Sequence, residues 1–304
     1  MEEAQLAQAR ELVGERLGLE FPGARDDELC AGLLASAARL RLPSVETLLD
    51  RLAATGWRHR EWGVVASRLT IGETCFFRNA ASFEALKAHV LEPLIAERRR
   101  QGCRMLSLLS AGCASGEEAY SLAILIDRLI PDREDWLIRI FATDINPAAM
   151  AAARAGIYRA WSLREVPPQV RQLYFVRRGT RFEIAGNIRD RVSVAPFNLA
   201  AVDDDSALGL AGFDLILCRN VLMYLLPAAR QRAVRRLAAA LAPSGWLMTA
   251  PAEAVPELFA PLSSVVCGDA MLFRAEPPSA SLGPRAKQPL PAAAPASPAA
   301  GPRP

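Results

Sequence analysis

The chain has 304 residues, of which 51% are hydrophobic and 23% are charged, and this composition predicts a globular protein of about two domains with a tail. No apolar run approaches the roughly 18–20 residues that cross a bilayer, and the acidic N-terminus does not have the pattern of a signal peptide. The net charge of only +3 argues against a nucleic-acid binder that depends on bulk charge.

Cysteine and histidine narrow the chemistry further. The six cysteines are scattered without a CxxC pair, which is typical of free thiols in a reducing cytoplasm. His59 and His89 are the two histidines of the chain, so neither a histidine-based zinc site nor a Ser-His-Asp triad is expected, and no metal site is predicted. The reaction, if there is one, should therefore need no strong general base.

The first hundred residues predict helices. Apolar residues recur at helical spacing over 29–40, and Pro43-Ser44 then breaks the chain and offers an N-cap for the next helix. A further apolar-striped segment covers 57–69. Asn79 can cap one long helix that ends in the three arginines 98–100, whose charges favour a helix C-terminus.

After residue 104 the pattern changes to short apolar strands that alternate with helices. Strands are predicted at 105–110, 137–142, 192–195, 213–218 and 246–250, and helices at 117–130, from Pro147 onward and at 227–241. This alternation predicts an α/β fold with a mostly parallel sheet and helices on both faces. Residues 175–191 predict a small β-hairpin insertion with turns at Gly179 and Gly186.

A loop of small residues follows the first predicted strand, with the sequence SAGCASGEE over 110–118. Small residues let the backbone approach a ligand closely, and the loop leads into a helix N-terminus. A P-loop would carry a Lys-Ser/Thr pair, but Glu117 and Glu118 stand here, and they would repel phosphate and attract an ammonium or sulfonium group. Taken alone, the loop is either a cofactor site or a tight structural turn.

Polar residues also follow two later strands. Asp144 ends the second strand, where an acid commonly binds ribose hydroxyls, although it could instead cap the helix that begins at Asn146-Pro147. The strand at 213–218 continues into Asn220 and Tyr224 at the carboxyl edge of the sheet, where open α/β folds bind ligands. Together, the loop and these residues predict a site for an adenosine-containing cofactor.

Four blocks of this sequence resemble, in order, the chemotaxis-receptor methyltransferases of the CheR family, which transfer a methyl group from S-adenosylmethionine to receptor glutamates. The blocks are 70–78 (TIGETCFFR), 110–121 (SAGCASGEEAYS), 142–158 (ATDINPAAMAAARAGIY) and 213–224 (FDLILCRNVLMY). The resemblance covers about residues 1–275. It implies an S-adenosylmethionine-dependent, Rossmann-like methyltransferase sheet joined to an N-terminal all-helical domain, with S-adenosylhomocysteine as product.

The resemblance also implies boundaries and site residues. Residues 1–78 would be the helical domain with its interdomain segment, 79–276 the methyltransferase domain with its small β subdomain at 175–191, and 277–304 a Pro/Ala-rich disordered tail that links to any further interaction domain. Tyr224 would face the transferred methyl, and Arg78 would pair with the cofactor carboxylate and orient the substrate acid. The implied cofactor-binding residues are Thr74, Arg78, Gly112, Glu117 or Glu118, Asp144, Asn198, Leu199, Asn220 and Val221.

The sequence departs from the family pattern at several places, among them Ala119 in the position of the loop proline. Gly72 stands where the family often has asparagine, so one cofactor contact would be lost or moved, and APAE at 250–253 stands where the family often has GHSE. No site is assigned at 250–253. Two interpretations therefore remain beside the first: a methyltransferase with a different acceptor, and a non-catalytic, cofactor-binding signalling scaffold.

The expected partner is the helical cytoplasmic region of chemoreceptors, with no nucleic acid, no direct membrane insertion, a cytoplasmic location and a monomeric enzyme. Arg39, Arg41, Arg58 and Arg60 could meet an acidic receptor surface, or they could form a solvated helix face. In some family members the small β subdomain docks a receptor peptide. Here the insertion is short, so no peptide tether is predicted.

Overall fold

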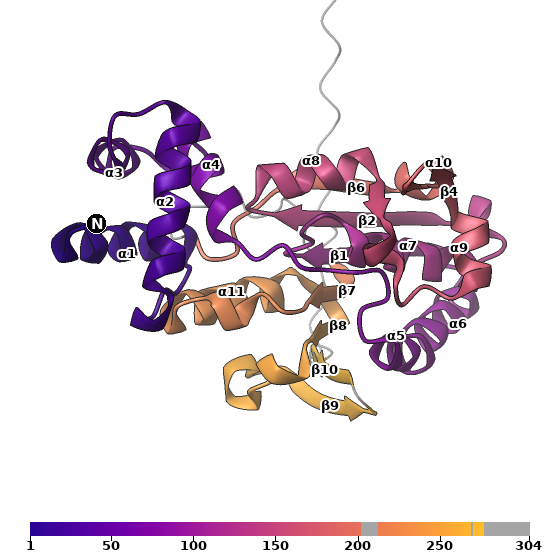
Figure 1. Cartoon of the computed structure of the whole chain (residues 1–304). Helices are drawn as coiled ribbons and strands as arrows, with labels where there is room; N and C mark the ends of the chain where they lie inside the picture. The colour runs from indigo at the N-terminus through magenta and orange to yellow at the C-terminus, as the bar shows by residue number, and fades with distance from the viewer. Residues whose placement is uncertain (202–211, 269, 277–304) are drawn as a thin grey trace, which may run out of the picture.

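The structure is a computed structural model that describes residues 1–201, 212–268 and 270–276. Its N-terminal part is a group of helices, coloured indigo and violet in Figure 1: α1 (Glu3–Leu17), a 3₁₀ turn (Gly23–Arg25), α2 (Asp26–Leu40), α3 (Val45–Ala53) and α4 (Arg60–Leu69). The predicted cap of α3 is confirmed, because the Ser44 hydroxyl oxygen accepts a hydrogen bond from the Thr47 N–H at 3.1 Å.

The single long helix predicted after Asn79 is divided in three: α5 (Ala80–Leu86), a π-helical turn (Lys87–Leu91) and α6 (Glu92–Arg100). Pro93 has no N–H to donate to the preceding turn, and this accounts for the interruption at that point. Phe83, Leu86 and Ile95 pack against the sheet and share no core with α1–α4. The chain therefore passes from the helical group to the sheet between α4 and α5.

The main sheet has seven strands in the order β6-β2-β1-β7-β8-β10-β9. Its strands are β1 (Met105–Ala111), β2 (Leu137–Asp144), β6 (Val192–Pro196), β7 (Phe213–Cys218), β8 (Leu241–Thr249), β9 (Ser263–Cys267) and β10 (Ala270–Arg274). The pairs from β6 to β8 are parallel, which confirms the predicted α/β fold, whereas β10 pairs antiparallel with both β8 and β9. The sequence pattern did not predict these last two strands.

Helices cover both faces of this sheet: α7 (Glu117–Leu129), α8 (Pro147–Ala155) and α11 (Pro227–Ala240), with α8 and α11 on opposite sides in Figure 1. All six residues of β7 are buried, as expected for a central parallel strand covered on both faces. One core joins α1–α4 and α11 to the sheet, and a second joins α5, α6 and α7 to it. The helical group is thus part of the same core as one sheet face.

A second, antiparallel sheet has the order β3-β5-β4, from β3 (Ile157–Arg159), β4 (Phe175–Arg178) and β5 (Arg181–Ile184). The predicted turn at Gly179 is confirmed, with φ of 62°. The predicted turn at Gly186 is wrong, because residues 186–189 form the short helix α10 (Gly186–Arg189). The small sheet also begins earlier than residue 175, since β3 pairs with β5.

The remaining elements are short. They are α9 (Pro168–Tyr174) and the 3₁₀ turns Arg133–Asp135, Ala160–Leu163, Leu222–Tyr224, Pro251–Glu253 and Pro256–Phe259. In the part of the chain that the structure describes, no helix has the length and apolarity to cross a membrane, and all six cysteines are free thiols. The predicted Pro/Ala-rich tail lies outside the described residues.

Candidate functional site

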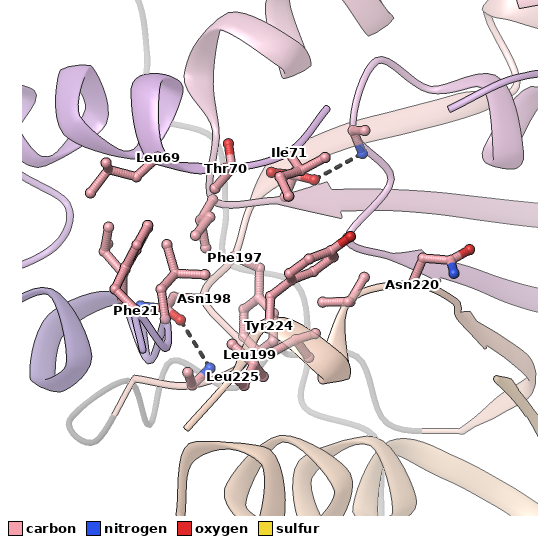
Figure 2. A pocket seen from close by; sticks show the side chains of 18 of the residues that line it. Phe21, Leu69, Thr70, Ile71, Phe197, Asn198, Leu199, Asn220, Tyr224 and Leu225 are labelled. Carbon is pink, nitrogen blue, oxygen red and sulfur yellow. Dashed lines mark hydrogen bonds between the residues drawn. The ribbon is translucent and has the colours of Figure 1, made fainter. Parts of the chain in front are cut away.

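A cavity lies at the carboxyl ends of the parallel strands, where the N-terminal helices meet the sheet (Figure 2). Strand β1 has β2 on one side and β7 on the other, so the chain order reverses here, and open α/β sheets bind ligands at such a point. Residues from both parts line the cavity: Leu17, Leu19, Phe21, Arg25, Leu69, Thr70, Ile71, Gly112, Ala114, Asp144, Ile145, Phe197, Asn198, Leu199, Ala200, Asn220, Val221, Tyr224 and Leu225.

A smaller, more polar compartment adjoins this cavity. Ile71, Gly112, Ala114 and Asn220 line both spaces. The other residues of the small compartment are Glu73, Thr74, Cys75, Arg78, Phe83, Cys113, Glu118 and Arg219. The site therefore has an apolar chamber of the kind that suits a nucleoside and a charged chamber that suits an amino-acid moiety.

The small-residue loop separates the two chambers. The Gly112 and Cys113 N–H groups both donate to the Thr143 carbonyl oxygen, at 2.7 and 2.9 Å, which holds the loop against the end of β2. Gly112 has φ of 78°, and a Cβ on it would lie 2.3 Å from Cγ2 of Val221. A side chain is therefore excluded at this position both by backbone conformation and by space.

Asp144 stands at the tip of β2 and holds the loop. Its Oδ2 accepts a hydrogen bond from the Ala114 N–H and its Oδ1 accepts one from the Asn146 N–H, both at 2.8 Å. Burial raises the pKa of the Asp144 carboxyl above its usual value, and the backbone hydrogen bonds lower it. Asp144 lines the cavity and each of its oxygens keeps a further lone pair, so the carboxylate can still accept hydrogen bonds from ribose hydroxyls.

The two adjacent glutamates of α7 have different surroundings. Glu118 lines the charged chamber, where its Oε1 accepts from the Ser110 hydroxyl at 2.8 Å and its Oε2 lies 3.5 Å from Nη1 of Arg219. Glu117 lines neither chamber, and its Oε2 accepts from the Ser115 hydroxyl at 2.7 Å. Burial raises the pKa of both carboxyls. Of the pair, Glu118 has the position to bind a ligand cation.

The segment around Arg78, between α4 and α5, is held in an unusual backbone conformation. Phe77 and Asn79 have φ of 55° and 59°, values that non-glycine residues seldom adopt, and they flank Arg78 in the sequence. The Ser121 hydroxyl accepts a hydrogen bond from the Phe77 N–H at 2.8 Å. Arg219 donates from Nη2 to the Arg78 carbonyl oxygen at 2.8 Å. These contacts fix the backbone from which the Arg78 side chain extends along the charged chamber.

Tyr224 lies where the N-terminal helices meet the segment after β7. The Glu20 N–H donates to the Tyr224 carbonyl oxygen at 2.8 Å, and Leu19 and Leu225 form an antiparallel bridge. Figure 2 shows the Tyr224 ring projecting into the cavity with its hydroxyl directed away from Leu225. The backbone that carries the phenol is therefore held by contacts between the two parts of the chain.

Asn198 and Leu199 line the apolar chamber on the side of β6. The Asn198 amide group is already used by the fold, because Nδ2 donates to the Arg16 carbonyl oxygen at 2.7 Å and Oδ1 accepts from the Ala200 N–H at 2.9 Å. This side chain connects the end of α1 to the loop after β6, and it helps to shape the wall of the chamber.

The structure places every predicted site residue except Glu117 at one of the two chambers. It adds residues that the sequence analysis missed. Arg219 lines the charged chamber, and Phe21 and Arg25 line the apolar one, with the Arg25 guanidinium 4.6 Å from the Phe21 ring centre. Arg219 directly precedes the predicted Asn220, so its position in the fourth block was an available signal. No local pattern marks Phe21 or Arg25, which reach the site only through packing between the two parts.

The residues present fit S-adenosylmethionine. Arg219 lines the charged chamber, and among the described residues its buried Nε has no hydrogen-bond partner, which leaves a donor for the carboxylate of an amino acid. Glu118 is placed for the ammonium group, Asp144 for the ribose hydroxyls, and Gly112 leaves room for the chain that joins them.

Among the described residues, no group of three or more His, Cys, Asp or Glu side chains could hold a metal ion. Burial raises the pKa of the Cys113 and Cys218 thiols, which argues against a nucleophilic cysteine here.

Comparison with known proteins agrees with this geometry. The family model described as "CheR methyltransferase, SAM binding domain" matches residues 72–267, more than half of the chain. "Chemotaxis protein methyltransferase 1" of Pseudomonas aeruginosa is 32% identical over 240 residues, or 77% of this chain and 84% of that protein. The protein of the same name in Vibrio cholerae is 32% identical over 241 residues, or 78% and 84%.

One relative is much longer. It is described as an "Uncharacterized 104.1 kDa protein" of Rhodobacter capsulatus, is 31% identical over 221 residues, and matches 72% of this chain but only 22% of its own length. The family match and the Pseudomonas and Vibrio relatives cover both the glycine loop and the segment of Tyr224. The chain belongs to the CheR family of S-adenosylmethionine-dependent methyltransferases.

Proposed function

We propose that this protein transfers the methyl group of S-adenosylmethionine to glutamate side chains of chemoreceptors, forming glutamyl methyl esters and S-adenosylhomocysteine. The observation that carries the proposal is the convergence of Arg78, Glu118, Asp144 and Tyr224 on one divided cavity at the strand tips. The names of the Pseudomonas and Vibrio relatives support the link to chemotaxis.

The side chains at the site suit this reaction. When bound, the cofactor supplies a methyl group on a sulfonium, which a carboxylate oxygen attacks directly; the new C–O bond forms as the C–S bond breaks, and sulfur keeps the electron pair. A glutamate has a pKa near ~4.3 and is ionised at pH 7, so no base is required. Neither His59 nor His89 lines the chambers. The chain needs only to orient the carboxylate and exclude water, and such positioning can contribute about 7–11 kcal/mol.

We assign each residue a part in that positioning. Glu118 and Asp144 would hold the ammonium and ribose ends, with Asn198, Leu199 and Val221 beside the adenosine. Thr74 and Arg78 would lie along the amino-acid end, and Tyr224 would face the transferred methyl. Arg78 and Tyr224 would orient the incoming carboxylate, because a guanidinium and a phenol both donate hydrogen bonds to carboxylate oxygens.

The surface beside the site supports an acidic partner. A groove between α4 and α8 is lined by the cations Arg39, Arg58, Arg60 and Arg68 with His59, and none of its lining residues is an acid. Ile145 lines both this groove and the cofactor cavity, so the two are adjacent. We propose that an acid-rich helical segment of a receptor lies along this groove, in the cytoplasm, and that a single copy of the enzyme suffices.

The proposal is tested by a labelled-methyl assay with receptor signalling domains, scored for base-labile esters. We expect Tyr224→Phe to keep the affinity for S-adenosylhomocysteine and to slow transfer by about 10-fold or more, because an orienting hydrogen bond to a charged group contributes about 1.5–3 kcal/mol. Unchanged turnover would refute the role of Tyr224. Cofactor binding without ester formation on any receptor would instead favour a scaffold or another acceptor.

A further inference from the structure

The carboxylate of Glu253 is buried and lies beneath the segment that carries the proposed catalytic tyrosine. Glu253 is 5% exposed and ends the 3₁₀ turn Pro251–Glu253, just after β8. Its Oε2 accepts hydrogen bonds from the N–H groups of Asn220 and Ala250, at 2.7 and 3.2 Å. Its Oε1 accepts from the N–H groups of Val221 and Met223, at 2.7 and 3.2 Å. Four backbone donors thus converge on one side chain.

The carboxylate supplies the acceptor for the N–H groups of this segment, while Arg230 and the Glu20 N–H hold its carbonyl oxygens. Asn220 has φ of 58°, in the left-handed region that asparagine adopts more readily than most non-glycine residues, and this conformation turns successive N–H groups toward one point. Buried N–H groups without an acceptor are costly, so a neutral or shorter side chain at position 253 would favour a different path for the chain. The acceptor and the left-handed turn therefore support each other.

The same residues form the cofactor cavity. Asn220 and Val221 line it, Val221 lies against Gly112, and Tyr224 ends the 3₁₀ turn that begins immediately after Val221. Glu253 itself lines neither chamber. Glu253 therefore reaches the chambers through the segment 219–224, and its charge also acts on Glu118, whose pKa it raises.

We propose that Glu253 is a positioning residue of this methyltransferase, which holds residues 220–223 in a left-handed turn and so sets the direction of the Tyr224 phenol. The inference rests on the proposed function of Tyr224. It adds a residue that follows β8, the strand next to β7, where the sequence analysis assigned no site. It predicts that loss of the carboxylate lowers catalysis more than it lowers cofactor affinity.

The test compares Glu253→Gln with Asp214→Asn. Glutamine keeps one acceptor oxygen and presents an NH₂ group to backbone donors, so the segment should loosen. Asp214 is a matched control, because it is also buried, pairs with Arg98 and accepts from the Ser107 N–H at 2.9 Å, but it lies at the start of β7 and far from the carboxyl edge. Glu253→Asp, which keeps the charge, is the second variant if glutamine prevents folding.

Hydrogen–deuterium exchange and steady-state kinetics are measured on all variants. We expect Glu253→Gln to raise exchange of peptides covering 219–224 and to lower kcat by about 10- to 100-fold, with a smaller change in the Kd of S-adenosylhomocysteine. In the double variant with Tyr224→Phe, Glu253→Gln should lower kcat by a smaller factor than it does alone. Asp214→Asn should lower Tm without either change.

Unaltered protection of 219–224 in Glu253→Gln, or a kcat effect fully additive with Tyr224→Phe, would overturn the proposal. The hydrogen–deuterium exchange measurement requires no methyl acceptor. If the wild-type protein fails to methylate receptors, the proposed function is wrong. Hydrogen–deuterium exchange with S-adenosylhomocysteine bound still tests whether Glu253 holds the segment 219–224.

Discussion

The adjacent glutamates of α7 allow a sharp test of the cofactor site, because only Glu118 lines the charged chamber. Glu118→Gln keeps the shape of the side chain and removes its charge. The side chain is 13% exposed, so water screens its interaction with a ligand ammonium group only weakly. A hydrogen bond to a charged group contributes about 1.5–3 kcal/mol. We therefore expect the Kd of S-adenosylhomocysteine to rise about 10- to 150-fold near pH 7.5.

The same substitution should change how affinity depends on pH. Burial raises the pKa of Glu118 above its usual value, so the carboxyl of the free protein takes up a proton at a higher pH than an exposed glutamate does. The protonated form does not attract an ammonium group. Wild-type affinity should therefore fall as pH falls through the raised pKa. The loss caused by Glu118→Gln should be largest at neutral pH and should shrink in acid.

Titration calorimetry with S-adenosylhomocysteine between about pH 5 and 8 measures both effects, with Glu117→Gln as the matched control. Glu117 is also buried but directs its carboxylate to the Ser115 hydroxyl, so its substitution should leave affinity within about threefold of wild type. Equal losses in the two variants, or a Glu118→Gln loss that is constant with pH, would refute the assignment. Asp144, whose pKa burial also raises, should leave part of the pH dependence in both variants.

Two further predictions concern the ribose contact and the partner surface. Asp144→Ala removes the acceptor of two backbone N–H groups as well as the proposed ribose partner, so calorimetry should detect no binding of S-adenosylhomocysteine; measurable affinity would argue against the ribose role. Replacing Arg39 and Arg60, both exposed and both lining the groove between α4 and α8, by glutamate should raise the KM for receptor about 10-fold and make it more sensitive to salt, with unchanged kcat and cofactor affinity. An unchanged KM would mean that these arginines form a solvated face.

The parts of the fold that the sequence predicted are those with strong local signals. Ser44 and Asn146 both cap the helices that they were expected to cap, and the central strand Phe213–Cys218 is apolar at every position except Asp214. Strands β9 and β10 have weaker patterns; β10 pairs antiparallel with β8, and β9 pairs antiparallel with β10 at the sheet edge. The pairing of β10 with β8 joins residues far apart in the sequence, such as Met271 and Thr249, and no short window of sequence contains it.

The candidate site likewise contains residues that the sequence could predict and residues that it could not. The residues of the glycine loop and the tips of β2 and β7 could be named because parallel strands bring their carboxyl ends to one edge. The choice between Glu117 and Glu118 could not be made, since it depends on which side of the first turn of α7 faces the chamber. Glu253 was missed for a different reason: it acts through hydrogen bonds to a backbone more than 30 residues away in sequence, and such bonds have no side-chain signature.

The position of the cavity explains why the helical group and the sheet must act together. Asn146 donates from its N–H to Asp144 and from its amide Nδ2 to the Thr70 hydroxyl at 2.8 Å, and the Ser67 hydroxyl donates to its Oδ1 at 2.9 Å. Asp144, the residue proposed to bind the ribose, is thus connected to the end of α4 through the Asn146 side chain. A ligand that binds to both the helical group and the sheet stabilises the arrangement in which the two are in contact. The gain in free energy is about 2.7 kcal/mol when the ligand concentration is 100 times its Kd. Cofactor binding should therefore stabilise the contact between the two parts, and the basic groove beside α4 adjoins the cavity through Ile145.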